Sequence, residues 1–295
     1  MSKPRRVRPV ILVTAFVLLI VLFGGMVFAA LHHGEKVRFG LTPGAHAFGA
    51  ARMMQSPSSQ YIATLYDDEE VILRALDNHL LDAAMISVEA ALALPEDAYE
   101  IRGVFSVTDL LVVSSDETVL NIGSLSGRAL ILPENLAGSK EESMLKKLLN
   151  EEDAAGYTLQ YSRDVAGTYL ETPGSVMIIQ MDDLRAVLQK APGAAARFRL
   201  SNQWRTSFLT VPPAGYVIVC RKDILGTGTC LSFEKALRDS MVYADRKRKK
   251  TIAMATAAGI FDSEETAEQL IDFMSFSYHE GADMQAAIGA WETLQ

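Results

Sequence analysis

Short strand-like and helix-like segments alternate along almost the whole chain after residue 35. Clusters of apolar and β-branched residues between turn residues predict the strands. These strands are KVRFGL (36–41), QYIATLY (60–66), DAAMIS (82–87), YEIRGVF (99–105), LLVVSS (110–115), 128–132, TLQYS (158–162), SVMIIQ (175–180), RFRL (197–200) and the beginning of AGYVIVCRKDIL (214–225). Strands that alternate with helices favour an α/β fold with mostly parallel sheets covered on both faces.

Capping residues mark where the helices begin. Ser139 is followed three positions later by Glu142, a capping box that predicts a helix to about Leu149. Further helices are predicted to begin at the acidic residues Asp67, Asp262 and Asp283. Gly281 is expected to interrupt the helical structure between the last two helices. About 260 residues of such units exceed what one small sheet needs, so we expect two lobes, with ligands at the carboxyl ends of the strands.

The first 34 residues differ in kind from the rest. Four basic residues within 1–8 precede the uncharged run VILVTAFVLLIVLFGGMVFAAL (10–31). A run of this length predicts one membrane helix, retained as an anchor or cleaved as a signal near residues 27–29. By the positive-inside rule, residues 1–8 stay cytoplasmic. The body is then extracytoplasmic, held at the cell membrane by a single pass, or secreted or periplasmic after cleavage.

The formal charge separates the same two parts. The chain carries -8 in total, so the part after the four basic residues carries -12. An acidic body argues against nucleic acid as a partner. The basic run 246–250 is typical of a solvated helix face, with contact to anionic lipid or a partner as the alternative.

The sequence predicts no catalytic residue, no metal site and no cofactor. GxSxG, HExxH, GxxxxGK[ST] and EF-hand patterns are all missing from the sequence. The two cysteines, Cys220 and Cys230, lack a metal-binding spacing. Outside the cell they can form a disulfide, and the alternative is two independent thiols.

Several segments together resemble the type II periplasmic solute-binding proteins of ABC importers. They are KVRFGL with TPGAH, ALDNHLLDAAMIS, SLSGRALILPENLAGSKEESMLKKLL, AGYVIVCRKDIL and the helical tail AAGIF to ETL. The nearest branch binds pyrimidine precursors of thiamine, sulfonates and nitrate. Asn78-His79 stands where the family usually has a glycine before the third strand, and the iron motif and lipid-anchoring cysteine of relatives are absent from the sequence.

The resemblance implies a two-lobed periplasmic-binding-protein type II fold with a two-segment hinge, preceded here by one N-terminal membrane helix. We expect the crossings between lobes near Val113–Asp116 and Pro212–Gly215. Residues 1–34 then form the basic tip and the anchor or signal. Lobe one is 35–113 plus 216–295, and lobe two is 114–215.

Candidate ligand-binding residues follow the strand ends of lobe one. Thr42, Gly44 and His46 come directly after the first strand, where a glycine lets the backbone approach a ligand. A plain turn with a solvated histidine is the alternative. Ser87 ends the third strand, where it contacts ligand or caps the next helix.

The candidates in lobe two precede a helix. Asn135, Gly138 and Ser139 lead into a helix N-terminus, a position that can bind anions or simply be capped. Glu141 and Glu142 occupy the first turn, which favours a neutral or zwitterionic ligand. Further candidates are Gln180 at a strand end and the aromatic residues Trp204 and Tyr216, which either stack on a flat ligand or pack in the core.

The function expected from the resemblance is capture of a small polar or heteroaromatic metabolite by lobe closure. The protein is expected to be monomeric, to deliver its ligand to ABC permease subunits and to meet the membrane through residues 10–31. One alternative is an anchored sensing domain that reports to a signalling partner. A secreted or anchored enzyme on the same fold is the third possibility.

Overall fold

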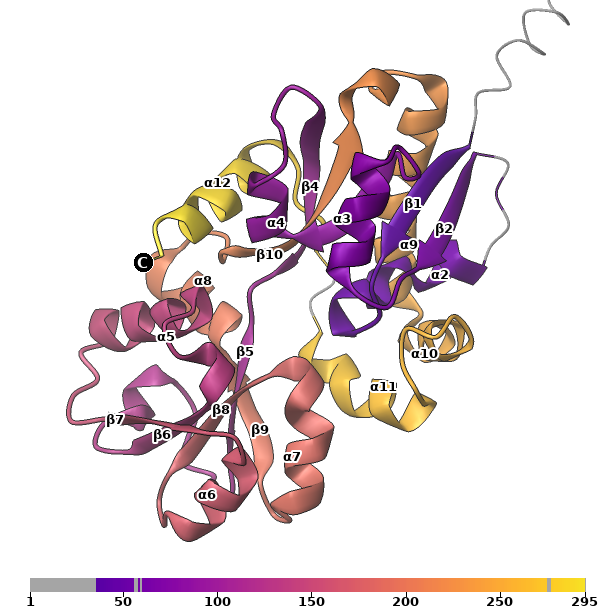
Figure 1. Cartoon of the computed structure of the whole chain (residues 1–295). Helices are drawn as coiled ribbons and strands as arrows, with labels where there is room; N and C mark the ends of the chain where they lie inside the picture. Colours follow the sequence, from indigo (N-terminus) through magenta and orange to yellow (C-terminus); the bar gives the residue numbers. More distant parts are fainter. Residues whose placement is uncertain (1–35, 56–57, 59, 275–276, 295) are drawn as a thin grey trace, which may run out of the picture. The chain divides into compact units, whose positions relative to one another are not determined.

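The first of two sheets is built from five strands of widely separated parts of the chain. They are β1 (Val37–Leu41), β2 (Tyr61–Leu65), β3 (Ala83–Ser87), β4 (Tyr99–Val107) and β10 (Ala214–Arg221), in the order β2-β1-β3-β10-β4. β1 is parallel to β2 and β3, whereas β10 is antiparallel to β3 and β4. Figure 1 shows the computed structural model, which describes residues 36–55, 58, 60–274 and 277–294.

The second sheet repeats this pattern. Its strands are β5 (Leu110–Ser114), β6 (Ala129–Pro133), β7 (Thr158–Ser162), β8 (Val176–Gln180) and β9 (Ala195–Arg199), in the order β7-β6-β8-β5-β9. β6 is parallel to β7 and β8, and β5 is antiparallel to β8 and β9. Each sheet is therefore mixed rather than mostly parallel. The reversed strand in each is the one that enters directly from the other sheet.

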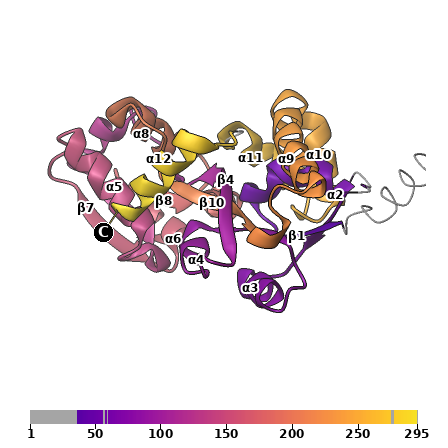
Figure 2. The same cartoon turned by 90° about the horizontal axis from the view of Figure 1, so that it is seen from above.

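Helices cover both faces of both sheets. They are α2 (Ala51–Gln55), α3 (Glu69–Asp77), α4 (Val88–Leu92), α5 (Lys140–Glu151), α6 (Val165–Glu171), α7 (Leu184–Lys190), α8 (Leu200–Phe208), α9 (Gly228–Arg246), α10 (Arg248–Ala257), α11 (Glu264–Leu270) and α12 (Gly281–Glu292). Figure 2 shows α3 and α9 on opposite sides of the first sheet. The buried apolar side chains form two core clusters. Phe233 of α9 packs with Phe39 of β1 in one cluster, and Ile72 of α3 belongs to the second.

Most helix starts agree with the sequence to within one or two residues. Ser139 accepts a hydrogen bond from the Glu142 amide at 3.1 Å, as the capping box predicts. The caps of α3 and α11 are Asp68 and Ser263, each one residue after the predicted acid. Gly281 was expected to stop the chain, but it is the first residue of α12.

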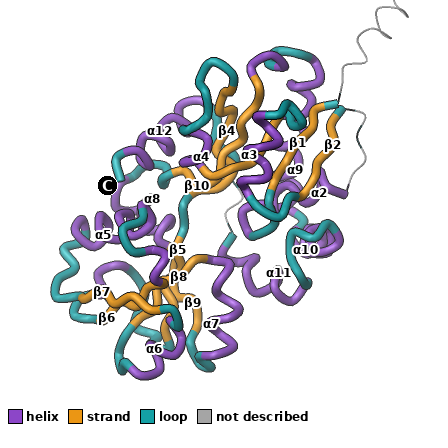
Figure 3. The backbone as a smooth tube through the Cα atoms, in the orientation of Figure 1, coloured by secondary structure: helices purple, strands orange, loops and turns teal. Residues whose placement is uncertain are grey.

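The first crossing between the sheets lies earlier than the sequence suggests. β4 ends at Val107 in the first sheet and β5 begins at Leu110 in the second, so the chain crosses at 108–109 and not at 113–116. LLVVS reads as a strand from its composition, but its sheet is decided by its pairing with β8 and β9. The return crossing lies at 209–213, between α8 and β10. Figure 3 shows both connections.

The two crossing segments are bonded to each other. The Thr108 amide donates to the Pro213 carbonyl at 2.7 Å, and the Thr108 hydroxyl donates to the Ala214 carbonyl at 2.8 Å. Gly215 lies so close to this contact that a Cβ atom there would be 2.9 Å from the Val107 carbonyl carbon. The two crossing segments therefore form one paired element, and their close approach leaves no room for a Cβ atom at position 215.

Two expectations concern the ends and the cysteines. The expected membrane helix at 10–31 lies outside the described residues. No helix within the part of the chain that the structure describes combines the length and apolarity needed to cross a membrane. Cys220 in β10 and Cys230 in the first turn of α9 are both buried free thiols.

Replacing His79 by glycine should stabilise the protein. The left-handed position after α3 belongs to His79, with φ 56°, and not to Asn78, whose φ is -83°. Because His79 is exposed and an L side chain is strained there, His79→Gly should raise the free energy of unfolding by about 0.5–1 kcal/mol. Urea denaturation measures this change in the free energy of unfolding. Asn78→Gly, the control, should give no gain, and a loss in His79→Gly would refute the argument.

Gly215→Ala should destabilise the hinge. The added Cβ meets backbone atoms of Val107 and Thr108, which cannot rotate away, so we expect a loss of about 1–3 kcal/mol in unfolding free energy. The matched control is Gly228→Ala in the first turn of α9, where no atom lies within 4 Å of the added group. Equal stability of the two variants in chemical denaturation would contradict the close approach.

Candidate functional site

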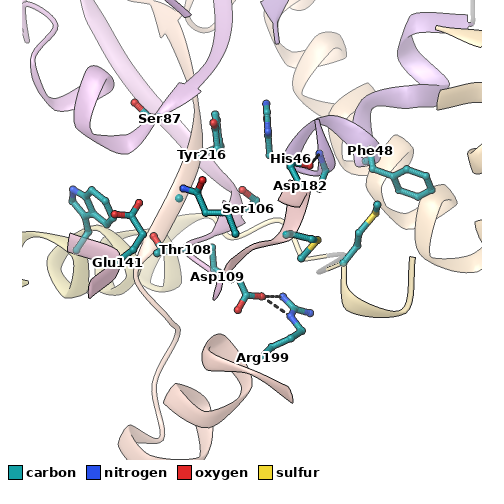
Figure 4. Close-up of a pocket in the computed structure, with 18 of the residues that line it drawn as sticks. His46, Phe48, Ser87, Ser106, Thr108, Asp109, Glu141, Asp182, Arg199 and Tyr216 are labelled. Carbon is teal, nitrogen blue, oxygen red and sulfur yellow. Dashed lines mark hydrogen bonds and ion pairs between the residues drawn. The ribbon is translucent and has the colours of Figure 1, made fainter. Parts of the chain in front are cut away.

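A cavity of about 280 Å³ lies where the carboxyl ends of strands from both sheets meet. The first sheet contributes residues after β1, the end of β3 and Tyr216 of β10. The second contributes the end of β8 and Arg199 of β9, and the crossing at 106–109 lies between them. Figure 4 shows side chains from these elements directed toward a common space. This is the position at which open α/β sheets bind ligands.

An aromatic pair forms one wall. The His46 and Tyr216 rings stack with centroids 3.8 Å apart and an angle of 5° between their planes. Thr42 Oγ1 and His46 Nε2 share a hydrogen bond of 3.0 Å, which fixes the imidazole. Burial lowers the pKa of His46 to about 4, so the ring is neutral at pH 7 and its face is available for stacking.

Asp182, beyond the end of β8, reaches across to the first sheet. Its Oδ1 accepts a hydrogen bond of 3.0 Å from the Ala45 amide. Gly44, with φ 129°, makes the approach possible, since a Cβ there would lie 3.3 Å from Asp182 Oδ2. Loss of solvent around this carboxylate raises its pKa even though the residue keeps an exposed side.

A buried ion pair lies below the crossing. Asp109 accepts hydrogen bonds from Arg199 Nε at 2.5 Å and from the Ser201 hydroxyl at 2.8 Å. Burial raises the pKa of Asp109, whereas Arg199 and Ser201 act in the opposite direction. The guanidinium of Arg199 thus lines the cavity but is already engaged.

Ser87 caps the next helix, as the sequence allows, and it also lines the cavity. Its Oγ accepts from the Ala90 amide at 3.2 Å, which caps α4. The same hydroxyl donates to Glu69 Oε1 at 2.9 Å. Ser87 is therefore fixed in place by Glu69 and by the start of α4.

The electrostatic character of the cavity is acidic. Glu89, Glu141 and Asp182 all line it. Burial raises the pKa of Tyr216 to about 12, with smaller contributions from nearby carboxylates, among them Asp182 and Glu141. Among the described residues, no cluster of three or more metal-ligating side chains is found.

The sequence-based candidates divide into two groups. The cavity is lined by His46, Ser87, Gln180 and Tyr216. Thr42 bonds to the lining residue His46, and Gly44 lies next to the lining residues His46 and Asp182. The others, Asn135, Gly138, Ser139 and Trp204, are not among the lining residues.

Local bonding explains the second group. The Gly138 amide donates to Glu142 Oε2 at 2.5 Å and Ser139 caps α5, so the helix start is occupied by its own side chains. Trp204 lies on α8 and is 2 % exposed, and its ring centroid is 4.4 Å from that of Phe208. Its ring belongs to the core between α8 and α5.

Several lining residues were not predicted as site residues. The apolar ones include Phe48, Met181, Met241, Met274 and Trp291, and the polar ones include Ser106, Asp109 and Arg199. Asp109 and Arg199 are 90 positions apart, so no spacing rule could pair them. Asp182 lies just after the end of β8, a place where a carboxylate can equally cap the following helix, so the sequence alone does not single it out.

Comparison with solved structures identifies the fold. An ABC transporter protein from Parabacteroides distasonis aligns with a TM-score of 0.64 at 18% identity, over 86% of this chain and 89% of that chain. The periplasmic aliphatic sulphonate binding protein SsuA from Escherichia coli gives 0.56 at 13% identity, over 88% and 87%. The ligand binding component of an ABC-type import system from Staphylococcus aureus, solved with zinc bound, gives 0.52 at 12% identity, over 88% and 90%.

The chain has the fold of type II periplasmic solute-binding proteins. The two-lobed α/β fold that the sequence resemblance implied is thereby confirmed. At these identities, what the chain shares with these structures is the fold. No protein-family model matches the sequence, and neither does any curated protein.

The depressed pKa of His46 predicts a pH-dependent stability. The unfolded chain binds a proton at this residue near pH 6.5, whereas the folded chain does so only near pH 4. Stability from this residue is therefore complete above pH 6.5 and is lost as the pH falls toward 4, by at most about 3 kcal/mol.

Unfolding free energies between pH 7.5 and 4.5 test this expectation. His46→Gln should flatten the curve, while His279, whose pKa is also lowered by burial, still contributes in the variant. A His46 imidazole signal that titrates near pH 6.5 in NMR spectra would contradict the burial argument.

Proposed function

We propose that the protein is the extracytoplasmic solute-binding component of an ABC importer. It would capture a small polar or heteroaromatic metabolite and present the closed form to permease subunits. The observation that carries the proposal is the position of the cavity, which takes its walls from both sheets and lies beside the paired crossing segments. The lobes would be 36–107 with 214–294, and 110–208.

Polar contacts across the cavity support a closing movement. Asp182 bonds to the Ala45 amide, and the Lys140 ammonium donates to the Trp291 carbonyl at 3.0 Å. Arg185 of α7 donates to the Thr266 hydroxyl of α11 at 2.5 Å. Hydrogen bonds of this kind contribute about 1–3 kcal/mol each, so ligand binding can shift the balance between open and closed forms.

The site favours binding over covalent chemistry. The Ser87 hydroxyl is held by Glu69, and the imidazole of His46 is held by Thr42 and stacked on Tyr216. In both pairs a hydroxyl faces a basic group, but Ser87 is also held as the cap of α4, and among the described residues no third group forms a hydrogen bond that orients the His46 ring, as a catalytic triad requires. Rings and polar atoms around a small concave space are instead typical of small-molecule recognition.

The proposal predicts ligand-dependent closure. Leu80 and Leu120 are exposed, one in the first lobe and one in the second. Replacing both by cysteine and attaching a label to each allows the distance between the lobes to be measured in the full chain in detergent. A compound from a thermal-shift screen of thiamine precursors, sulfonates, nitrate and amino acids, or one that co-purifies in native mass spectrometry, should shorten that distance.

Tyr216→Leu should weaken binding of the same compound by about tenfold or more, because it removes the stacking surface. Tyr169→Leu is the matched control, since Tyr169 is half-buried and bonds to Ser115 away from the cavity. If no compound binds and the label distance never changes, the proposal is wrong.

A further inference from the structure

We propose that the ligand of this cavity carries a positive charge, as a small amine or a protonated nitrogen heterocycle. The inference rests on the proposed solute-binding function and goes beyond it by naming the ligand class. It depends on the charges that line the cavity, on the state of the only guanidinium among them and on the aromatic wall.

The lining carries an excess of carboxylates. Of the charged lining residues, Glu89, Asp109, Glu141 and Asp182 are acidic and Arg199 is basic. The pair Asp109–Arg199 neutralises itself, because both oxygens of Asp109 are engaged by Arg199 and Ser201. Three carboxylates therefore remain to act on whatever enters the cavity.

Among the residues that the structure describes, these three carboxylates form no ion pair. Within the described part of the chain, no salt bridge includes Glu89, Glu141 or Asp182. Asp182 accepts a hydrogen bond from the neutral Ala45 amide, and burial raises the pKa of its carboxyl although that amide acts in the opposite direction. A cation in the cavity would supply that compensation.

The groups that could bind an anion are already occupied. His46 is neutral at pH 7, so it adds no positive charge. The start of α5 is closed by Glu142, which accepts from the Gly138 amide, and by Ser139. Glu141 in the same turn would repel an anion. A sulfonate or nitrate would therefore meet three carboxylates and no free donor of positive charge among the lining residues.

The aromatic wall suits a flat cation. The stacked rings of His46 and Tyr216 present π-surface beside Asp182. Figure 4 shows Glu141 and Asp182 on opposite sides of the drawn space in that view, with Tyr216 between them. A positive charge over an aromatic face and near carboxylates gains from both.

A set of three probes with one skeleton tests the charge. Benzamidine, benzamide and benzoate share a ring and a similar size, but they are cationic, neutral and anionic. Calorimetric titration of the full chain in neutral detergent should show benzamidine binding at least about tenfold more tightly than benzamide, and benzoate binding most weakly.

Charge-neutralising variants show which carboxylates cause the preference for the cationic probe. Asp182→Asn and Glu141→Gln should each weaken benzamidine binding by about tenfold and should reduce the difference from benzamide. Glu151→Gln removes the same charge at the exposed far end of α5 and should leave affinity unchanged. Two independent variants keep the test valid if one of them folds poorly.

The outcomes separate this inference from the proposed function. Benzoate or benzamide binding as tightly as benzamidine, or unchanged affinity in both cavity variants, overturns the inference while leaving solute binding intact. If none of the three probes binds, the charge of a compound found by native mass spectrometry decides, and a neutral or anionic compound overturns the inference. Failure of every solute to bind overturns the proposed function itself, and this inference with it.

Discussion

The position of every other part of the site depends on the paired crossing of the chain between its two sheets. Thr108 bonds to Pro213 and Ala214 through both its amide and its hydroxyl, and Gly215 leaves room for that approach. The next residue, Asp109, forms a buried pair with Arg199 of the second sheet. Because removing one partner of a buried pair costs about 3–5 kcal/mol, this point resists change and would be the fixed point of the proposed closure.

The distribution of strong and weak interactions suits a receptor that closes. The strong ones, the backbone pairing at Thr108 and the Asp109–Arg199 pair, lie at the crossing. The contacts across the cavity are fewer and more exposed, such as Lys140 with Trp291 and Arg185 with Thr266. A ligand needs to add only a few kcal/mol of differential interaction to move such an equilibrium from mostly open to mostly closed.

The sequence predicted the elements well and their assembly less well. Strands such as TLQYS were placed to the residue because composition and flanking turns are local properties. The sheet to which LLVVS belongs was predicted wrongly, since that depends on pairing with residues 64 to 88 positions away. Likewise, Asn78 is the better left-handed residue by chemistry, but the end of α3 places His79 there, because the helix geometry sets which residue must turn.

The site shows the same division between local and distant information. His46, Ser87 and Tyr216 could be found because they lie on or directly after strands, and strand ends converge in this fold. The charge of the cavity could not, because it depends on whether each carboxylate finds a distant partner. Asp109 finds Arg199, whereas Asp182 meets only a backbone amide. The net charge of the body says nothing about this difference, and it is the unpaired carboxylates, not the total, that select the charge of a ligand.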